Sequence, residues 1–440
     1  MKKIGKLFLV IIMGISLMGC QPDQKSVKKI VLTVKTPPIG VGNIPDIGEQ
    51  EVYDFLKKAE KKFTEQYKEY DVEFKISKFN YQDEKTQLAD KYGTDEAVDI
   101  FYSGSWNIPT YVANGWMVPL EDILDDGLKE DIDENIIKQN TIDGHLYTMP
   151  FQQLQNTLMV NKTMMKKAGL DKYIPTDDKI AQWSTKDFDY IFKKLKESMK
   201  ESNHFPMMMY AANNQGDNHI MTLLRSYGSQ LYDENGMFCI DSPEGIKALK
   251  WIVELNQQEI TPKGCENMEL IDNLNLFYNQ QLAICIGNLT NLWDSWNKNI
   301  DVFAANFPSL DGKGYAVNST NGFCVFNNGD QDKIKAAKDF IRYIYTDEEL
   351  MKYTLGTLPV NKSVIQKYKD EIRMLEAYGN NNVNCIDNIQ NKLNWQGVRD
   401  VFYTNIRDLL LEDKTPEEVA KNIDESCNAA LEKGIQDAKK

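Results

Sequence analysis

The stretch AVDIFYSGSWN, residues 97–107, joins a short apolar segment to a polar one. Residues 97–102 are apolar or aromatic apart from one aspartate, which is typical of a strand buried in a sheet. Ser103, Ser105, Trp106 and Asn107 follow directly. In open α/β sheets, ligands bind in the crevice outside the carboxyl ends of the strands. These four side chains are therefore candidates for a ligand site.

Strand-like and helix-like segments alternate along the rest of the chain. Two near-continuous apolar runs, QLAICIG and GFCVF, are typical of strands that are covered on both faces. The alternation predicts an α/β protein with mainly parallel sheets, and the length of 440 residues predicts two lobes. Strands are expected at 28–36, 72–76, 97–102, 158–160, 206–210, 281–287 and 322–326. Helices are expected at 52–67, 220–227, 246–253 and 334–345, and over most of the last eighty residues.

The first residues are not expected to belong to this fold. Three lysines precede a short apolar run that ends in Leu-Met-Gly-Cys at residues 17–20. The run is too short for a membrane-spanning helix, which needs roughly 20 residues, and it predicts a secretory signal over residues 1–19. The tetrapeptide resembles the lipobox of bacterial lipoproteins. Cys20 is therefore the expected lipidation site, and residues 20–27 form a flexible tether. The alternative is an ordinary signal peptide with an incidental thiol.

Charge and cysteine content exclude several classes of protein. The chain has 51 basic and 65 acidic residues, a net charge of −14, which argues against nucleic acid and against adhesion to anionic lipid. Membrane contact is expected through the lipid anchor only. The other cysteines are widely spaced and form no CxxC motif, so no zinc or redox centre is predicted, and disulfide pairing stays open. Cys285 and Cys324 are expected in the core.

Motifs of familiar enzyme classes are absent from the sequence. It contains no GxxxxGK[ST], GxSxG or HExxH, and its three histidines are not spaced as metal ligands. We therefore expect no enzymatic activity, no cofactor and no metal. A glycoside hydrolase stays an alternative, because its two carboxylates need not be close in sequence.

Aromatic and amide side chains recur beside several expected strands. Tyr210 and Trp293 follow strands, as Trp106 and Asn107 do, and Asn321 precedes one. An aromatic ring stacks on the apolar face of a sugar, while amides bind its hydroxyl groups. Only Arg225 lies near these segments, which argues against a phosphate or carboxylate ligand. For each residue alone, the alternative is ordinary packing or a loop cap.

Six segments, in order, resemble a known family. They are VDIFYSGSWNIPTYVANGWMVPLEDIL, IDGHLYTMPF with TLMVNKTMMKKAGL, DSPEGIKALKWIVEL, FYNQQLAICIGNLTNLWDSW, FAANFPSLDGKG with NGFCVF, and AAKDFIRYIYTDEELMKYTLGTLPVNKSV. The family is the family 1 extracellular solute-binding proteins of bacterial ABC transporters, typical of sugar uptake. An aromatic residue of the family pattern is Leu289 here, so Trp293 or Trp296 is expected to take its place.

The resemblance implies a two-lobed periplasmic-binding-protein type II fold with a hinge and an interlobe ligand cleft. The N-terminal lobe would comprise residues 28–150 plus 297–350, and the C-terminal lobe residues 151–296 plus 351–440. It also implies a monomer, anchored outside the cell membrane of a Gram-positive type bacterium. This protein would capture a carbohydrate, in particular an oligosaccharide, and deliver it to a permease. The alternatives are the same fold binding a peptide, polyamine or metal, and a sensor lipoprotein.

The resemblance also distributes the ligand-binding residues between the lobes. Trp106 and Asn107 would line one lobe, and Tyr210 and Trp293 the other. Asn321 would come from the segment after the return crossing.

Overall fold

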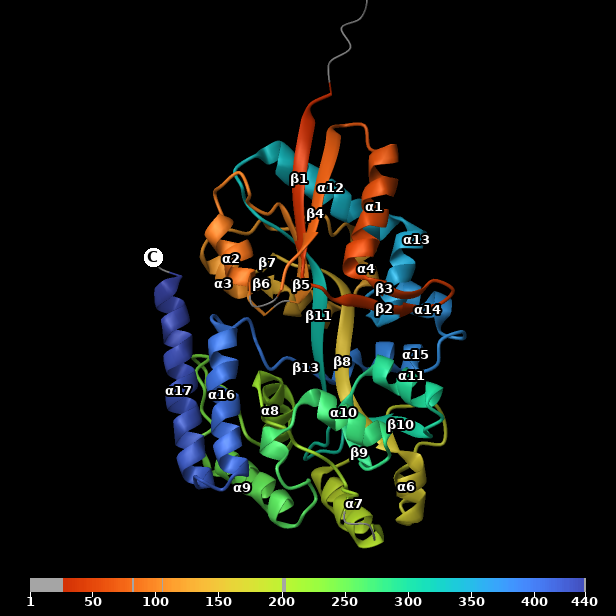
Figure 1. Ribbon diagram of the computed structural model, residues 1–440, viewed down its shortest axis with the longest axis vertical. Helices are drawn as coiled ribbons and strands as arrows, with labels where there is room; N and C mark the ends of the chain where they lie inside the picture. The colour runs from red at the N-terminus through yellow and green to blue at the C-terminus, as the bar shows by residue number, and fades with distance from the viewer. Residues whose placement is uncertain (1–26, 81–82, 105, 200–202, 439–440) are drawn as a thin grey trace, which may run out of the picture.

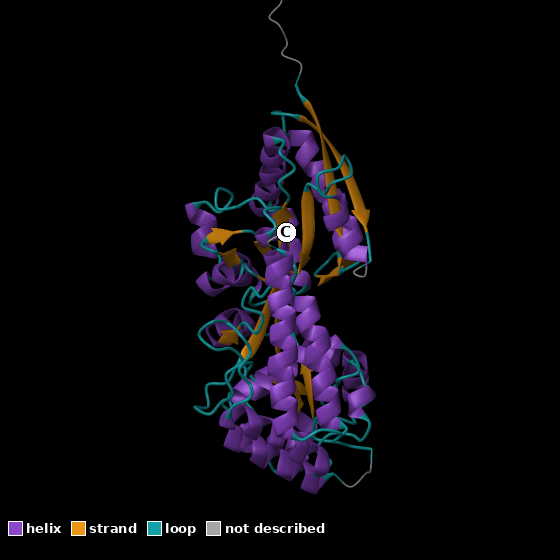
Figure 2. Ribbon diagram, turned by 90° about the vertical axis from the view of Figure 1, so that its left-hand side faces the viewer, coloured by secondary structure: helices purple, strands orange, loops and turns teal. Residues whose placement is uncertain are grey.

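The structure is a computed structural model that describes residues 27–80, 83–104, 106–199 and 203–438. Two lobes lie one above the other along the longest axis (Figures 1 and 2). The expected signal over residues 1–19, the lipidation site Cys20 and the tether up to residue 26 lie outside the described residues. Within the described part of the chain, no helix combines the length and apolar character needed to cross a membrane.

The N-terminal lobe is built around three parallel strands and two long helices. β1 (Lys29–Thr36) pairs in parallel with both β4 (Asp71–Lys78) and β5 (Ile100–Gly104). Leu32 and Phe55 belong to the core that the sheet shares with α1 (Val52–Gln66) and α12 (Gln331–Thr346). Phe101 and Cys324 belong to a smaller core on the other face. Because strand residues alternate between two cores, the runs of sequence around them are almost continuously apolar.

Shorter elements complete this lobe. They are β2 (Gly40–Ile44), β3 (Gly48–Glu51), α2 (Glu84–Gln87), α3 (Ile108–Ala113), α4 (Asp126–Asp131), α5 (Glu134–Gln139), β6 (Thr141–Ile142), β7 (His145–Leu146) and α13 (Glu348–Met351).

The C-terminal lobe is mostly helical around a small antiparallel sheet. Its single large core includes Phe277, Ile284 and Phe402. The long helices α16 and α17 pack against each other at one side of the lobe (Figure 1). The elements are α6 (Lys162–Lys167), α7 (Thr185–Ser198), α8 (Asp217–Ser226), α9 (Pro243–Gln257), α10 (Leu270–Tyr278), β9 (Ile284–Gly287), α11 (Leu289–Asn297), β10 (Val302–Ala305), β12 (Leu358–Pro359), α14 (Lys362–Tyr368), α15 (Leu375–Asn380), β13 (Cys385–Ile386), α16 (Trp395–Leu410) and α17 (Pro416–Asp437).

Two long strands connect the lobes. β8 (Met149–Asn161) and β11 (Ala316–Val325) pair with each other and join the strands of both lobes in the order β10-β8-β11-β5-β1-β4. β11 is antiparallel to both β8 and β5, and β9, β10 and β12 are antiparallel to β8. The prediction of mainly parallel sheets is therefore wrong. The chain leaves the N-terminal lobe on β8 and returns on β11, so the two strands must run in opposite directions.

The crossings differ from the expected lobe boundaries at one place. The first crossing, expected near 150, lies along β8. The second was expected near 297, but Ile300 and Phe307 are buried in the core of the C-terminal lobe, because β10 pairs with β8 and extends the sheet there. The chain returns only at β11. Near the third expected crossing the chain passes between the cores more than once, because Tyr353 and Val360 belong to the core of the N-terminal lobe and Leu355 and Leu358 to that of the other.

Most of the expected elements are present. The helices predicted at 52–67, 220–227, 246–253 and 334–345 are α1, α8, α9 and α12, and the C-terminal region is mostly helical. Cys285 and Cys324 are buried as predicted, and the cysteines among the described residues are free thiols. The strand predicted at 206–210 is wrong. The bridge from Phe205 to Leu282 lies just before this segment, and Pro206 has no N–H group to extend it into a ladder.

Backbone segments approach closely beside the third crossing. Gly42 lies in β2 with φ +100°, and a Cβ atom placed on it would lie 2.1 Å from the carbonyl oxygen of Gly356. Gln152 of β8 joins the same segments, because its Nε2 donates to the carbonyl oxygens of Val41 at 2.9 Å and Tyr353 at 3.2 Å. The β2–β3 hairpin is thus held against the start of the crossing segment.

Candidate functional site

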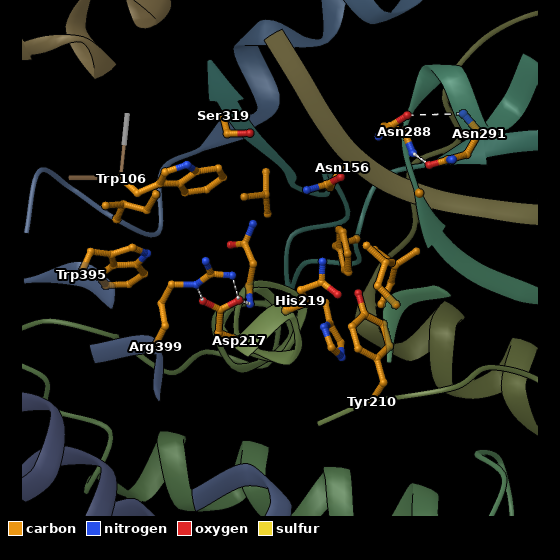
Figure 3. Close-up of a pocket in the computed structure, with 18 residues that line it drawn as sticks. Trp106, Asn156, Tyr210, Asp217, His219, Asn288, Asn291, Ser319, Trp395 and Arg399 are labelled. Carbon is orange, nitrogen blue, oxygen red and sulfur yellow. Dashed lines mark hydrogen bonds and ion pairs between the residues drawn. The ribbon is translucent and has the colours of Figure 1, made fainter. Parts of the chain in front are cut away.

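A cavity of about 190 Å³ lies where the lobes meet beside β8 and β11. Its walls combine aromatic rings, amides and one pair of opposite charges (Figure 3). Trp106 comes from the N-terminal lobe, Asn156 and Ser319 from the crossing strands, and most of the other residues from the C-terminal lobe. The lining residues are Trp106, Asn156, Tyr210, Gln215, Asp217, Asn218, His219, Leu270, Ile286, Gly287, Asn288, Asn291, Phe307, Val317, Ser319, Ile389, Trp395 and Arg399.

Trp106 reaches the cavity because β5 ends at a glycine. A Cβ atom on Gly104 would lie 2.5 Å from the indole Nε1 of Trp106. The absence of a side chain at Gly104 therefore leaves room for the ring to fold back beside the end of the strand. Trp395, the first residue of α16, is buried on the same side of the cavity, and Figure 3 shows both indoles grouped with Arg399. This end of the cavity offers aromatic surface.

The rings of Tyr210 and His219 lie against each other at another side of the cavity. Their ring centroids are 4.1 Å apart with an angle of 30° between the planes. Both side chains are buried, and neither ring nitrogen of His219 has a hydrogen-bond partner among the described residues. Burial lowers the pKa of His219 to about 3 and raises that of the Tyr210 hydroxyl above its ordinary value. Both groups are consequently neutral at physiological pH.

Amide groups face the cavity from the start of α11. Asn288 caps this helix, since its Oδ1 accepts hydrogen bonds from the backbone N–H groups of Thr290 and Asn291. The side chain of Asn291 in turn accepts a bond from the N–H of Asn288 at 3.1 Å. The reciprocal pair fixes both side chains at the wall of the cavity. The Nδ2 group of Asn288 has no acceptor among the described residues, so it is free to donate to a ligand.

Among the described residues that line the cavity, Asp217 and Arg399 are the charged ones. Nε of Arg399 lies 2.6 Å from Oδ2 of Asp217, and the guanidinium carbon lies 5.6 Å from the centroid of the Trp106 ring. Burial raises the pKa of the Asp217 carboxyl, and the pair with Arg399 acts against that rise. The ion pair holds α16 against α8 directly at the cavity.

The structure brings only part of the predicted site together. Trp106 and Tyr210 both line the cavity. Asn107 does not, because its Nδ2 donates to Glu84 at 2.9 Å. Trp293 points elsewhere from α11, and its indole N–H donates to the carbonyl oxygen of Arg373 at 3.1 Å. Asn321 lies within β11, opposite Gly104 in the register, and is outside the cavity lining.

Reasoning from the sequence missed most of the lining residues, among them the charged pair and its neighbours. Asp217 and His219 lie in the first turn of α8, just beyond the segment that contains Tyr210. Trp395 and Arg399 are one helical turn apart on α16, a spacing that places them on one face. No local signal connects α16 with residues almost two hundred positions earlier, so only the packing of α16 against α8 reveals the pair. The expectation that Arg225 is the only arginine near the site is wrong for this reason, since Arg399 lines the cavity.

The described residues offer no obvious metal centre. Among them, no group of three or more histidine, cysteine, aspartate or glutamate side chains is placed to hold a metal ion.

Solved structures of other proteins share this two-lobed architecture. Maltose-bound MalE3 of T. maritima superposes with a TM-score of 0.70 at 20% identity, covering 91% of this chain and 100% of the other. The cyclic alpha-maltosyl-1,6-maltose binding protein of Arthrobacter globiformis gives 0.73 at 18%, covering 92% and 100%. The sugar-binding protein MalE of Xanthomonas citri gives 0.74 at 13%, covering 92% and 98%. The fold is therefore that of the two-lobed binding proteins.

Sequence comparison identifies the family. The model for bacterial extracellular solute-binding proteins matches residues 48–351, and the chain belongs to this family. An arabinooligosaccharide-binding protein of Halalkalibacterium halodurans is 23% identical over 322 residues, which is 66% of this chain and 67% of that protein. A putative binding protein of Brucella abortus is 23% identical over 269 residues, or 60% of this chain. The match spans about 62% of the length of that relative.

Proposed function

We propose that this protein binds a neutral carbohydrate, in particular an oligosaccharide, in the cavity between its lobes. The observation that carries the proposal is the composition of the walls. Trp106 and Trp395 provide flat apolar surfaces, while Asn156, Asn288 and Ser319 provide neutral hydrogen-bonding groups. A sugar ring needs both, an apolar surface for its C–H face and polar partners for its hydroxyls. Relatives named for maltose and arabinooligosaccharide binding support the same class of ligand.

Binding is expected to close the lobes on the ligand. Trp106 follows β5 of the N-terminal lobe and packs against the core of the C-terminal lobe, to which Tyr210 belongs, so a ligand that contacts both stabilises the closed arrangement. Bending is expected along β8 and β11, which join residues 28–148 to the C-terminal lobe. The closed monomer would then deliver the sugar to the permease of an ABC importer without altering any bond of the sugar.

A thermal-shift screen tests the ligand class. A ligand that binds only the folded state raises the melting temperature, by an amount that grows with its concentration over Kd. The chain from residue 27 is screened against mono- and oligosaccharides, a peptide mixture and polyamines. We expect an oligosaccharide to raise the melting temperature and to be recovered unhydrolysed. A shift with peptide or polyamine only, or release of sugar products, would contradict the proposal.

Matched tryptophan variants test the site. Trp106→Ala removes an aromatic wall and is expected to abolish the shift produced by the sugar. Trp293→Ala removes a tryptophan whose indole bonds outside the cavity, so this variant should retain the shift. If W293A loses the response and W106A keeps it, the ligand binds elsewhere.

We also infer that Cys20 anchors the protein on the outer face of the cell membrane. The support is the sequence LMGC at residues 17–20, and a family whose members act outside the cell. The full-length chain, expressed in a Gram-positive host with a labelled fatty acid, should take up label and sediment with membranes. Cys20→Ala should abolish labelling, and label retained by C20A would refute the assignment.

A further inference from the structure

Asp217 and Arg399 carry opposite charges at the wall of the cavity, and the other described lining residues are uncharged or, like His219, neutral at physiological pH. The two side chains differ in access to solvent, since that of Asp217 is 3% exposed and that of Arg399 is 17% exposed. The acid is thus enclosed, whereas part of the base reaches the cavity.

The partners of Asp217 account for both of its oxygens. Oδ2 accepts the 2.6 Å bond from Nε of Arg399, and Oδ1 accepts a 2.6 Å bond from the backbone N–H of Asn218. A buried carboxylate without such partners would be strongly disfavoured. Asp217 is therefore already saturated by the protein and has little capacity left for a ligand.

Arg399 is saturated on one side only. Its Nη2 donates to the backbone oxygen of Asn214 at 3.0 Å and lies 3.5 Å from Oδ1 of Asp217. Its Nη1 has no acceptor among the described residues. Figure 3 shows this nitrogen on the side of the guanidinium away from Asp217, toward Trp106. The cavity thus contains a guanidinium that can donate to a ligand but whose charge is compensated from behind.

We propose that Asp217 makes the site selective for uncharged sugars by neutralising Arg399 before the ligand arrives. This inference rests on the proposed carbohydrate function. A hydroxyl or ring oxygen of a neutral sugar accepts a bond from Nη1 and needs no counter-charge. A uronic acid would place its carboxylate beside Arg399, the one cation among the described lining residues, which Asp217 has already paired and beside which Asp217 is a like charge. A like charge in a poorly solvated site disfavours such a ligand.

The neutral pair also predicts what happens when one charge is removed. In Asp217→Asn, the side chain keeps its shape and an oxygen for Arg399, but the guanidinium becomes an uncompensated cation, so acidic sugars should gain affinity. In Arg399→Gln, Asp217 loses its counter-charge and the guanidinium vacates the space between this carboxylate and the cavity, so the ammonium group of an amino sugar can take that place and amino sugars should gain affinity. The two variants are expected to change selectivity in opposite directions.

The experiment measures affinity by titration calorimetry with matched trisaccharides based on maltotriose, cellotriose and galactotriose. Each set has a neutral member, a member with one uronic acid and a member with one amino sugar. The wild type should bind a neutral member at least about tenfold more tightly than its charged counterparts, and D217N should gain at least about tenfold for the uronic acid member. R399Q should show the corresponding gain for the amino sugar. Each gain should decrease at high salt.

A second ion pair in the same lobe provides the control. Arg373 contacts Asp178 through two hydrogen bonds, at 2.8 and 2.7 Å, outside the cavity. Asp178→Asn should therefore leave selectivity unchanged.

The other possible results also decide whether Asp217 has this role. Equal affinity of the wild type for neutral and acidic sugars would overturn it, as would folded D217N and R399Q that gain nothing. If only one variant folds, its result is sufficient, because each gain is predicted independently. If a neutral sugar binds but the variants behave as the wild type does, the proposed function stands and the role of Asp217 is refuted. If none of the compounds binds, the inference fails together with the proposed function.

Discussion

His219 should make the folded protein sensitive to mild acid. In the folded state, burial lowers its pKa to about 3, whereas an unfolded histidine titrates near 6.5. Between these values the unfolded chain binds a proton that the folded chain does not, so stability decreases as the pH falls through this window. At one pKa unit per 1.36 kcal/mol, this residue alone should remove about 2 kcal/mol of unfolding free energy between pH 7 and pH 5.

The assay is chemical unfolding followed by tryptophan fluorescence at pH 7 and at pH 5. Because His219→Asn removes the titrating ring, its loss of unfolding free energy on acidification should be about 2 kcal/mol smaller than that of the parent. The matched control is Met221→Leu, which changes a buried residue of the same helix without removing a titrating group and should keep the parental loss. If H219N and the parent lose the same unfolding free energy on acidification, the His219 ring is not buried without a partner in solution. That result would refute the reasoning.

Two further predictions concern backbone geometry. Gly42→Ala would force a Cβ atom to 2.1 Å from a backbone oxygen at φ +100°, and should cost about 3 kcal/mol or more in denaturant unfolding. Gly48→Ala, at φ +90° with open space around it, should cost only about 1 kcal/mol, and equal losses would contradict the close approach. Ser184→Ala should cost about 1 kcal/mol, because Ser184 and Asp187 form the capping box that begins α7. Its melting midpoint is the measurement, and an unchanged midpoint would show that the capping box contributes nothing.

Local signals predicted most of the strands and the longer helices that carry a clear apolar periodicity. Periodic apolar residues located α1, α8, α9 and α12. Such signals depend on residues only a few positions apart, so they can be read directly from the order of residues in the sequence. They failed where the outcome depended on a distant partner. Residues 206–210 had the composition of a strand, but their neighbours at 282–284 and the missing N–H of Pro206 allowed only one bridge.

The predicted site residues show the same difference between local signals and contacts with distant residues. Trp106 and Tyr210 were predicted as site residues because each lies at the end of an apolar, strand-like segment. Both line the cavity. Trp293 met the same criterion, yet the rotation of α11 turns its indole toward Arg373. The direction in which a helical side chain points depends on which face the helix buries, and that is decided by the packing of the whole lobe.

By itself the sequence determined the α/β class, the family resemblance, the two-lobed plan and the aromatic character of the site. These follow from local periodicity, composition and the order of short motifs. Only the tertiary structure decided the directions of β8 and β11, the return crossing at 316–325, and the pairing of Asp217 with Arg399 beside Trp106. The physical reason is that these hydrogen-bond registers and this ion pair join residues 161 to 182 positions apart. Their geometry exists only after both lobes have packed.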